Sequence, residues 1–277
     1  MNDLEQGDTS AMPSQFNSHG KSVEQMHMPT VYKPDLKSFL GDPTPLCVYL
    51  VLFASLGFLN LINKLMNNSG IMGFILALTP FTCELMEFRG AFGAGAATVG
   101  PQYFFGGLLL ILASVLQFIL GNTFVFVVFG SFVAAFWLSY ATTLTPFYNA
   151  ATAYDATNPE NPGFYNAYGF FTLFMGLLCL IYLICSLRTN LCFVAIFLGL
   201  VLGFFLLTGA VWQLANGNPN LARTLKKAAG ACLALGSLPG WYFLLVQLLA
   251  TVDFPLTLPI GDLSRIIPGA SARKKMN

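Results

Sequence analysis

The chain has 277 residues, of which 56% are hydrophobic and only 9% are charged, and its formal net charge is +1. Because globular domains carry about 25% charged residues, a water-soluble fold of this size could not cover its surface, and the composition indicates an integral membrane protein. The small net charge argues against nucleic acid as a partner, since phosphate binding needs a dense basic patch.

Residue types that hold metals or perform catalysis are few. The six cysteines lie in apolar segments without a CxxC pair, as expected of small buried hydrophobic residues. His19 and His27 lie in a polar stretch and give a metal site no support. The sequence also lacks a Ser/His/Asp set and a phosphate-binding glycine loop followed by Lys. We therefore expect no enzyme activity, no metal and no cofactor.

A polar tail precedes seven apolar runs. Residues 1–41 are rich in Ser, Gln, Asn and Pro and lack the apolar core of a signal peptide, so we expect a disordered tail. About 20 apolar residues in a helix span the hydrocarbon core of a bilayer, so each run is a candidate membrane helix. The runs cover residues 46–63, 70–86, 103–120, 123–143, 168–187, 191–214 and 229–251.

Charges outside the runs indicate the orientation. Lys33 and Lys37 precede the first run, and the tail over residues 263–277 is basic, which places both termini in the cytosol. The loop 146–166 is acidic and has no Lys or Arg, which favours the outside face.

The charge rule is only partly obeyed. Arg223, Lys226 and Lys227 fall in a predicted loop that should also lie outside. Moreover, termini on one side require an even number of spans, whereas seven is odd. One run therefore needs another explanation.

Polar side chains inside the apolar runs are candidates for lining a solute path, because in lipid each must find a partner or face water. The alternative is that a Ser or Thr hydroxyl donates back to its own helix backbone. The candidates are Thr79, Thr82, Asn122, Thr123, Ser131 and Thr208.

Several motifs, in order, resemble those of one transporter family. They are Gly121–Phe124, Ser131 with Phe132, Phe136–Ser139, Leu187–Asn190, Lys227–Gly230 with Trp241, and Leu258–Gly261. They are similar to the signature of the acetate uptake transporters (succinate–acetate permeases, GPR/FUN34/YaaH) over about residues 42–262, in a fungal-type member. The resemblance implies a six-transmembrane-helix bundle in a ring of six protomers. It further implies proton-coupled uptake of acetate or another small monocarboxylate. The lack of an obvious transit peptide favours the plasma membrane.

The N-terminal signature of that family is matched in two separated halves. The first half lies within residues 42–46, and the second half is matched by Gly70 and the residues to Phe74. The stretch Cys47–Ser69 separates the two halves. Removing this stretch leaves six apolar runs, so we hypothesise that it is an insertion, such as a translated retained intron. The alternative is a genuine extra helix. The first half is matched by Asp42, Pro43, Pro45 and Leu46.

The resemblance also implies a constriction in the substrate path, formed by one bulky residue from each of three helices. By position these are Phe74, Phe132 and Leu200. An apolar narrowing excludes water and other ions. Phe132 replaces a common Tyr, and the interval from Asn122 to Trp137 is one residue longer than the family pattern. Since one residue turns a helix by about 100°, a bulge is needed there to keep the tryptophan in place.

Two further features bear on function. Gln117 stands where the family commonly has Glu, so Glu84 and Glu87 are the alternative carboxylates, either at a pore mouth or on the surface. Gly199 and Gly203 have the spacing that allows helices to approach closely. The altered signature and Gln117 also fit a non-transporting membrane sensor, and ammonium export is a further alternative.

Overall fold

The computed structural model of the chain describes residues 68–155, 161–264 and 266. The regular elements within these residues are all helices, joined by turns and loops, apart from an isolated bridge between Asn190 and Asp262. Several predictions lie outside the described residues: the tail 1–41, the signature half Asp42–Leu46, the run 46–63, the stretch 47–67 and most of the basic C-terminal tail.

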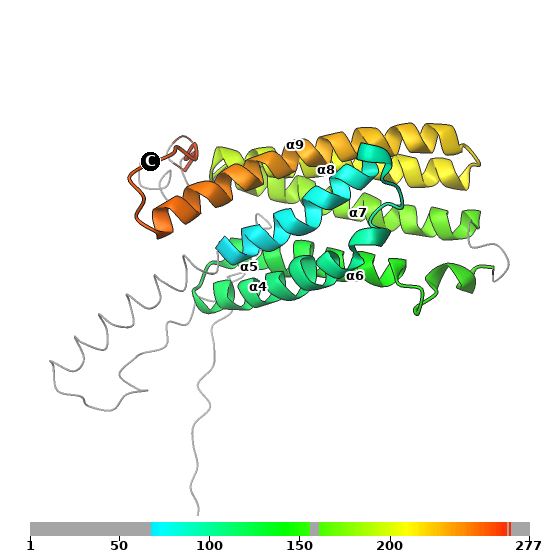
Figure 1. The fold of residues 1–277 in the computed structure, drawn as a ribbon, viewed down its shortest axis with the longest axis horizontal. Coiled ribbons are helices and arrows are strands. Elements are labelled where there is room, and N and C mark those ends of the chain that lie inside the picture. Colours follow the sequence, from blue (N-terminus) through cyan, green and yellow to red (C-terminus); the bar gives the residue numbers. More distant parts are fainter. Residues whose placement is uncertain (1–67, 156–160, 265, 267–277) are drawn as a thin grey trace, which may run out of the picture. The chain divides into compact units, whose positions relative to one another are not determined.

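Six of the seven predicted runs fold as helices that share one core (Figure 1). The first covers residues 68–85 within the described chain. The second consists of η2 (Ala96–Thr98), α3 (Val99–Pro101), η3 (Gln102–Leu109) and α4 (Leu110–Ile119). The third consists of α5 (Thr123–Val127), η4 (Val128–Ala134) and α6 (Ala135–Leu144). The others are α7 (Pro162–Ser186), α8 (Leu191–Ala215) and α9 (Pro219–Thr251), with short turns η1 (Phe88–Gly90) and η5 (Ala150–Ala153) between helices.

Five helices within the described residues are long and apolar enough to cross a membrane: Ala96–Ile119, Thr123–Leu144, Pro162–Ser186, Leu191–Ala215 and Pro219–Thr251. Their outer faces expose large apolar side chains such as Phe104, Phe118 and Phe174. Such continuous apolar surface suits lipid or another protein rather than water. The fold is therefore that of an all-α, multi-pass membrane protein.

The start of α9 differs from the sequence prediction. Arg223, Lys226 and Lys227 were expected in a loop, but α9 begins at Pro219 and carries all three on its first turns. Proline is favoured at the first helical position because its fixed φ suits a helix and its missing N–H would have no helical partner. The three cations therefore have a rigid support.

Close approach between α8 and α9 depends on small residues, as predicted. A Cβ added at Gly199 would lie 2.7 Å from both the Cys232 carbonyl oxygen and the Gly236 Cα. One added at Gly203 would lie 2.5 Å from the Leu233 side chain. The backbones meet where no side chain could stand between them, which holds the core-facing residues of α8 in place.

A π-helical segment occupies the interval that was predicted to need a bulge. η4 covers Val128–Ala134, between Asn122 and Trp137. A π turn holds more residues than an α turn and so accommodates an additional residue within a helix. Beyond it, Phe136 and Trp137 are both buried in the core.

Two of the sequence motifs meet at one end of the bundle. The Leu191 amide donates to the Gly261 carbonyl oxygen at 2.8 Å, and the Leu263 amide donates to that of Thr189 at 3.0 Å. The Tyr242 hydroxyl donates to the Pro259 carbonyl oxygen at 2.7 Å. The segment after α9 is thereby tied to the turn that precedes α8.

Candidate functional site

The structure brings together two of the three predicted constriction residues. Phe74 on the 68–85 helix and Leu200 on α8 are 5% and 2% exposed, and both line two small cavities in the core. These cavities have volumes of about 20 and 10 Å³. Because a water molecule needs about 10–15 Å³, each cavity has room for a single water at most. Phe132 lies on η4, and its side chain lies outside what the structure describes.

A larger cavity of about 350 Å³, here called the vestibule, adjoins this narrow region. It shares Phe81, Phe136 and Phe204 with the smaller of the two core cavities. Most of its lining is apolar, and its polar lining residues are Tyr140, Thr143, Tyr165, Tyr168, Thr172 and Lys226.

Aromatic rings make the wall between the vestibule and the narrow region rigid. The Phe136 ring meets that of Phe204 edge-on, with centroids 5.0 Å apart, and stacks on that of Phe171 at 5.9 Å. Phe81 meets Trp137 edge-on at 5.7 Å. Such arrangements contribute stability beyond the area they bury, so the wall holds its shape.

Two of the hydroxyl-bearing residues that line the vestibule, Thr172 and Tyr168, differ in their hydrogen bonding. Thr172 lines the cavity, and its Oγ1 lies 3.0 Å from the Oγ1 of Thr208, one of the predicted polar candidates. The Tyr168 hydroxyl oxygen is buried and has no hydrogen-bond partner among the described residues. A buried hydroxyl without a partner is unusual in proteins. The Tyr168 hydroxyl is therefore able to form a hydrogen bond with a solute in the vestibule.

The other predicted polar candidates lie outside the lining of the vestibule and the two core cavities. The Trp241 Nε1 donates to Thr79 Oγ1 at 3.0 Å, and the Thr82 hydroxyl donates to the Thr79 carbonyl oxygen. Asn122 Nδ2 donates to Gln117 Oε1 at 2.6 Å.

Two more of these candidates lie on the helix that contains η4. The Ser131 Oγ lies 2.7 Å from the Tyr182 hydroxyl on α7. Thr123 is exposed at the start of α5. Of the second signature half, Gly70 is buried where a Cβ would meet the Phe129 ring at 2.3 Å. Ser131 therefore links this helix to α7 and Gly70 allows close contact with Phe129, whereas Thr123 is exposed.

Beyond the vestibule lies a polar cavity of about 460 Å³, here called the basin. Its charged lining residues are Glu84, Glu87, Arg223 and Lys226. Lys226 lines both the basin and the vestibule. A cation therefore lies where the two cavities meet. The cavities follow one another from the charged basin, through the apolar vestibule, to the narrow core.

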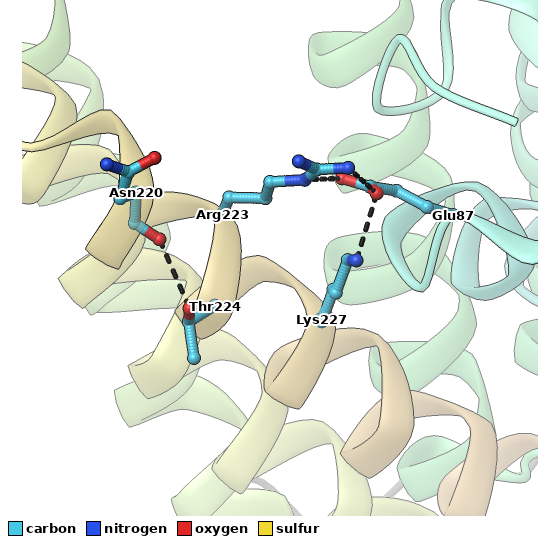
Figure 2. Close-up of polar contacts among 5 residues, drawn as sticks. All are labelled: Glu87, Asn220, Arg223, Thr224 and Lys227. Atoms are coloured by element: carbon cyan, nitrogen blue, oxygen red, sulfur yellow. Dashed lines mark hydrogen bonds and ion pairs between the residues drawn. The ribbon is translucent and has the colours of Figure 1, made fainter. Parts of the chain in front are cut away.

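The Glu87 carboxylate contacts two cations that reach it from α9 (Figure 2). Arg223 donates from Nε to Glu87 Oε1 at 2.6 Å and from Nη2 to Oε2, and Lys227 Nζ lies 3.0 Å from Oε2. The hydrogen bonds from Arg223 and then Lys227 lower the pKa of Glu87 from 4.5 to about 2. The carboxylate is therefore ionised throughout the physiological range.

Glu84 holds the loop that forms one wall of the basin. Its Oε2 accepts from the Gly95 amide at 2.7 Å and its Oε1 from the Thr98 hydroxyl at 3.0 Å, and the residue is only 8% exposed. In this loop Gly93, Ala94 and Gly95 have positive φ values of 111°, 50° and 96°. Glycine adopts such values freely, whereas for Ala94 the surroundings must impose the conformation. Sequence reasoning left Glu84 open between pore mouth and surface, and it lies buried beside the basin.

Comparisons with known proteins agree with this architecture. Residues 62–265 match the model of the GPR1/FUN34/yaaH family. The chain is 47% identical to protein alcS of Aspergillus fumigatus over 70% of this chain and 73% of that one. It is 31% identical to acetate permease A of Emericella nidulans over 74% of this chain and 68% of that one. The solved structure of the bacterial acetate channel SatP matches over 71% of this chain and 98% of the SatP chain, with a TM-score of 0.52 and 25% sequence identity.

Proposed function

The chain belongs to the GPR1/FUN34/yaaH family, and from this premise we propose that it transports acetate or another small monocarboxylate across a membrane. The observation that supports the proposal best is the succession of cavities that share lining residues, from the basin through the vestibule to Phe74 and Leu200. Acetate is what the names of acetate permease A and the SatP channel specify.

The chemistry of each cavity fits one stage of passage. The basin lining includes two cations, Arg223 and Lys226, that can pair with a carboxylate. The vestibule is lined mainly by apolar side chains, and moving an ionised carboxylate into apolar surroundings is far costlier than moving the neutral acid. The acid therefore enters the vestibule with a proton, which supports coupled uptake of acid and proton. The narrow core then excludes bulk water.

By the family resemblance, Phe132 is the third constriction residue beside Phe74 and Leu200, the 68–85 helix is the first of six spans, and six identical protomers assemble. The basic residues that flank the apolar runs support cytosolic termini. The lack of an obvious transit peptide supports the plasma membrane. The apolar side chains exposed on the outer helix faces are available for such an assembly.

The suspected insertion is part of the same proposal. Cys47–Ser69 would separate the signature residues Asp42–Leu46 from the helix that carries Phe74, and we expect this to impair transport. Two of its residues, Asn68 and Ser69, are already helical in the structure, and Asn68 Nδ2 donates to Thr251 Oγ1 at 3.0 Å.

Labelled acetate uptake tests the proposal, in cells without their own carrier and at acidic and neutral pH. The given chain and a chain lacking Cys47–Ser69 are expressed, and their amounts at the membrane are measured. Uptake by either chain establishes the transporter, and uptake by the shortened chain alone marks the stretch as an interruption. Absence of uptake with both chains at the membrane would refute transport of acetate and favour the sensor. Ammonium release in the same cells would favour export instead.

A further inference from the structure

The contact at the rim of the basin has the form of a bound carboxylate. Glu87 presents its two oxygens to two nitrogens of Arg223, and Lys227 approaches one of the same oxygens (Figure 2). Two parallel donors from one guanidinium are the geometry by which arginine recognises carboxylates. The end of a glutamate side chain, CH₂–COO⁻, differs from acetate only in its covalent link to the chain.

The contact is also one that a solute can displace. Side-chain exposure is 66% for Arg223, 45% for Lys227 and 23% for Glu87, and ion pairs exposed to this degree contribute little to stability. Glu87 has φ 58°, and Arg89 two residues later has φ 54°. Non-glycine residues hold left-handed conformations only where their surroundings impose them. Release of the Glu87 side chain therefore loses only an exposed ion pair, next to a turn whose backbone is strained.

We propose that Arg223 and Lys227 form a docking site for monocarboxylate anions, which Glu87 occupies in the resting chain and from which an incoming carboxylate displaces it. The site lies at the rim of the basin, which Arg223 lines. The inference rests on the proposed function and adds where the substrate is first recognised. Because Glu87 is ionised throughout the physiological range, the displacement is an exchange of one carboxylate for another.

Three variants test the site, with a matched control on the same helix turn. Thr224 adjoins Arg223 but bonds back to the Asn220 carbonyl oxygen at 3.1 Å (Figure 2). Glu87→Gln removes the competing charge, so the half-saturating acetate concentration should fall about two- to fivefold at an unchanged maximal rate, the range that corresponds to an exposed ion pair. Arg223→Gln should raise it, the double variant should match Arg223→Gln alone, and Thr224→Ala should resemble the parent chain.

A binding measurement separates this inference from the proposed function. The parent chain and the variants are purified in detergent, and sodium acetate is titrated against sodium chloride at equal ionic strength while the thermal midpoint is recorded. Acetate should raise the midpoint more in Glu87→Gln than in the parent, and not in Arg223→Gln.

The outcomes are distinguishable. Binding with this pattern but without uptake would leave the docking site standing and refute the proposed transport. Uptake with a half-saturating concentration that neither variant changes would refute the docking site and leave transport standing. An equal effect of chloride and acetate would also overturn the site, as would absence of both uptake and binding.

Discussion

Gly199→Ala gives the sharpest test of how the narrow core is built. Gly199 precedes Leu200 on α8, at the closest approach of this helix to α9. The added methyl carbon would lie 2.7 Å from the Cys232 carbonyl oxygen and from the Gly236 Cα, well inside the 3.4 Å at which ordinary contact begins. Both neighbours are backbone atoms, so a side-chain rotation cannot relieve the overlap. The two helices must move apart, and Leu200 moves with them.

The magnitude follows from a comparison with a second glycine of the same helix. A Cβ added at Gly209 would have its nearest neighbour, Leu225 Cδ1, at an ordinary 3.5 Å. Both substitutions gain about 0.8–1.0 kcal/mol of helix propensity, so this gain cancels between them. What remains is the cost of overpacking at Gly199, about 1–3 kcal/mol. For a chain of this size that difference lowers the thermal midpoint by roughly 2–4 °C per kcal/mol.

Thermal unfolding of both purified variants, with acetate uptake measured in parallel, provides the assay. Gly199→Ala should unfold several degrees below Gly209→Ala and transport more slowly at equal membrane abundance. Equal midpoints for the two variants would refute the reasoning, since they would show that α8 and α9 are not in backbone contact at Gly199. A lower midpoint with unchanged uptake would show that the position of Leu200 does not control passage.

Three further predictions concern the cavities. Leu200→Ala should join the two core cavities and increase the uptake of butyrate more than that of acetate. It should lower the free energy of unfolding by about 2–5 kcal/mol. Leu198→Ala, on the exposed side of α8, should change neither the uptake of the two acids nor the stability. Since the pKa of Glu87 is lowered from 4.5 to about 2, its ion pair is fully formed above pH 4.5 and is lost only as the pH falls through about 2. The ratio of uptake at pH 5 to pH 7 should therefore be the same in Glu87→Gln as in the parent, and a changed ratio would contradict this assignment. Glu84→Gln should accelerate hydrogen exchange of the Gly95 amide by roughly tenfold, because the acceptor loses its charge; unchanged exchange would mean that the loop does not depend on this carboxylate.

Much of the helix arrangement follows from local sequence patterns. Apolar runs predict helices because the lipid interior requires every backbone group to be paired within its segment. All six runs that fall within the described residues are helices. The extra residue between Asn122 and Trp137 predicted a bulge, and η4 lies in this interval. The charges at residues 223–227 indicated a loop, whereas Pro219, a residue favoured at the first position of a helix, indicated the true start of α9.

The contacts that make the basin could not be predicted in the same way. Glu87 and Arg223 are 136 residues apart, and no periodicity links positions at that separation. Their contact depends on the side-by-side packing of the 68–85 helix and α9, where a Cβ at Gly230 would meet Leu85 at 2.8 Å. Gly93 and Gly95, which follow Glu84 and Glu87, were the local signal of a turn after the first helix.

The tie between the segment after α9 and the turn before α8 has a mechanical consequence. Because the Leu191 amide and the Thr189 carbonyl oxygen bond to Gly261 and Leu263, the α8–α9 hairpin is closed into a loop at its open end. These two hydrogen bonds, here called the clasp, transmit tension applied to the C-terminus to the N-terminal end of α8 before the tension reaches α9. Pulling the protein from its C-terminus should therefore first rupture the clasp as a separate small event, and only afterwards extract the two helices from the bilayer.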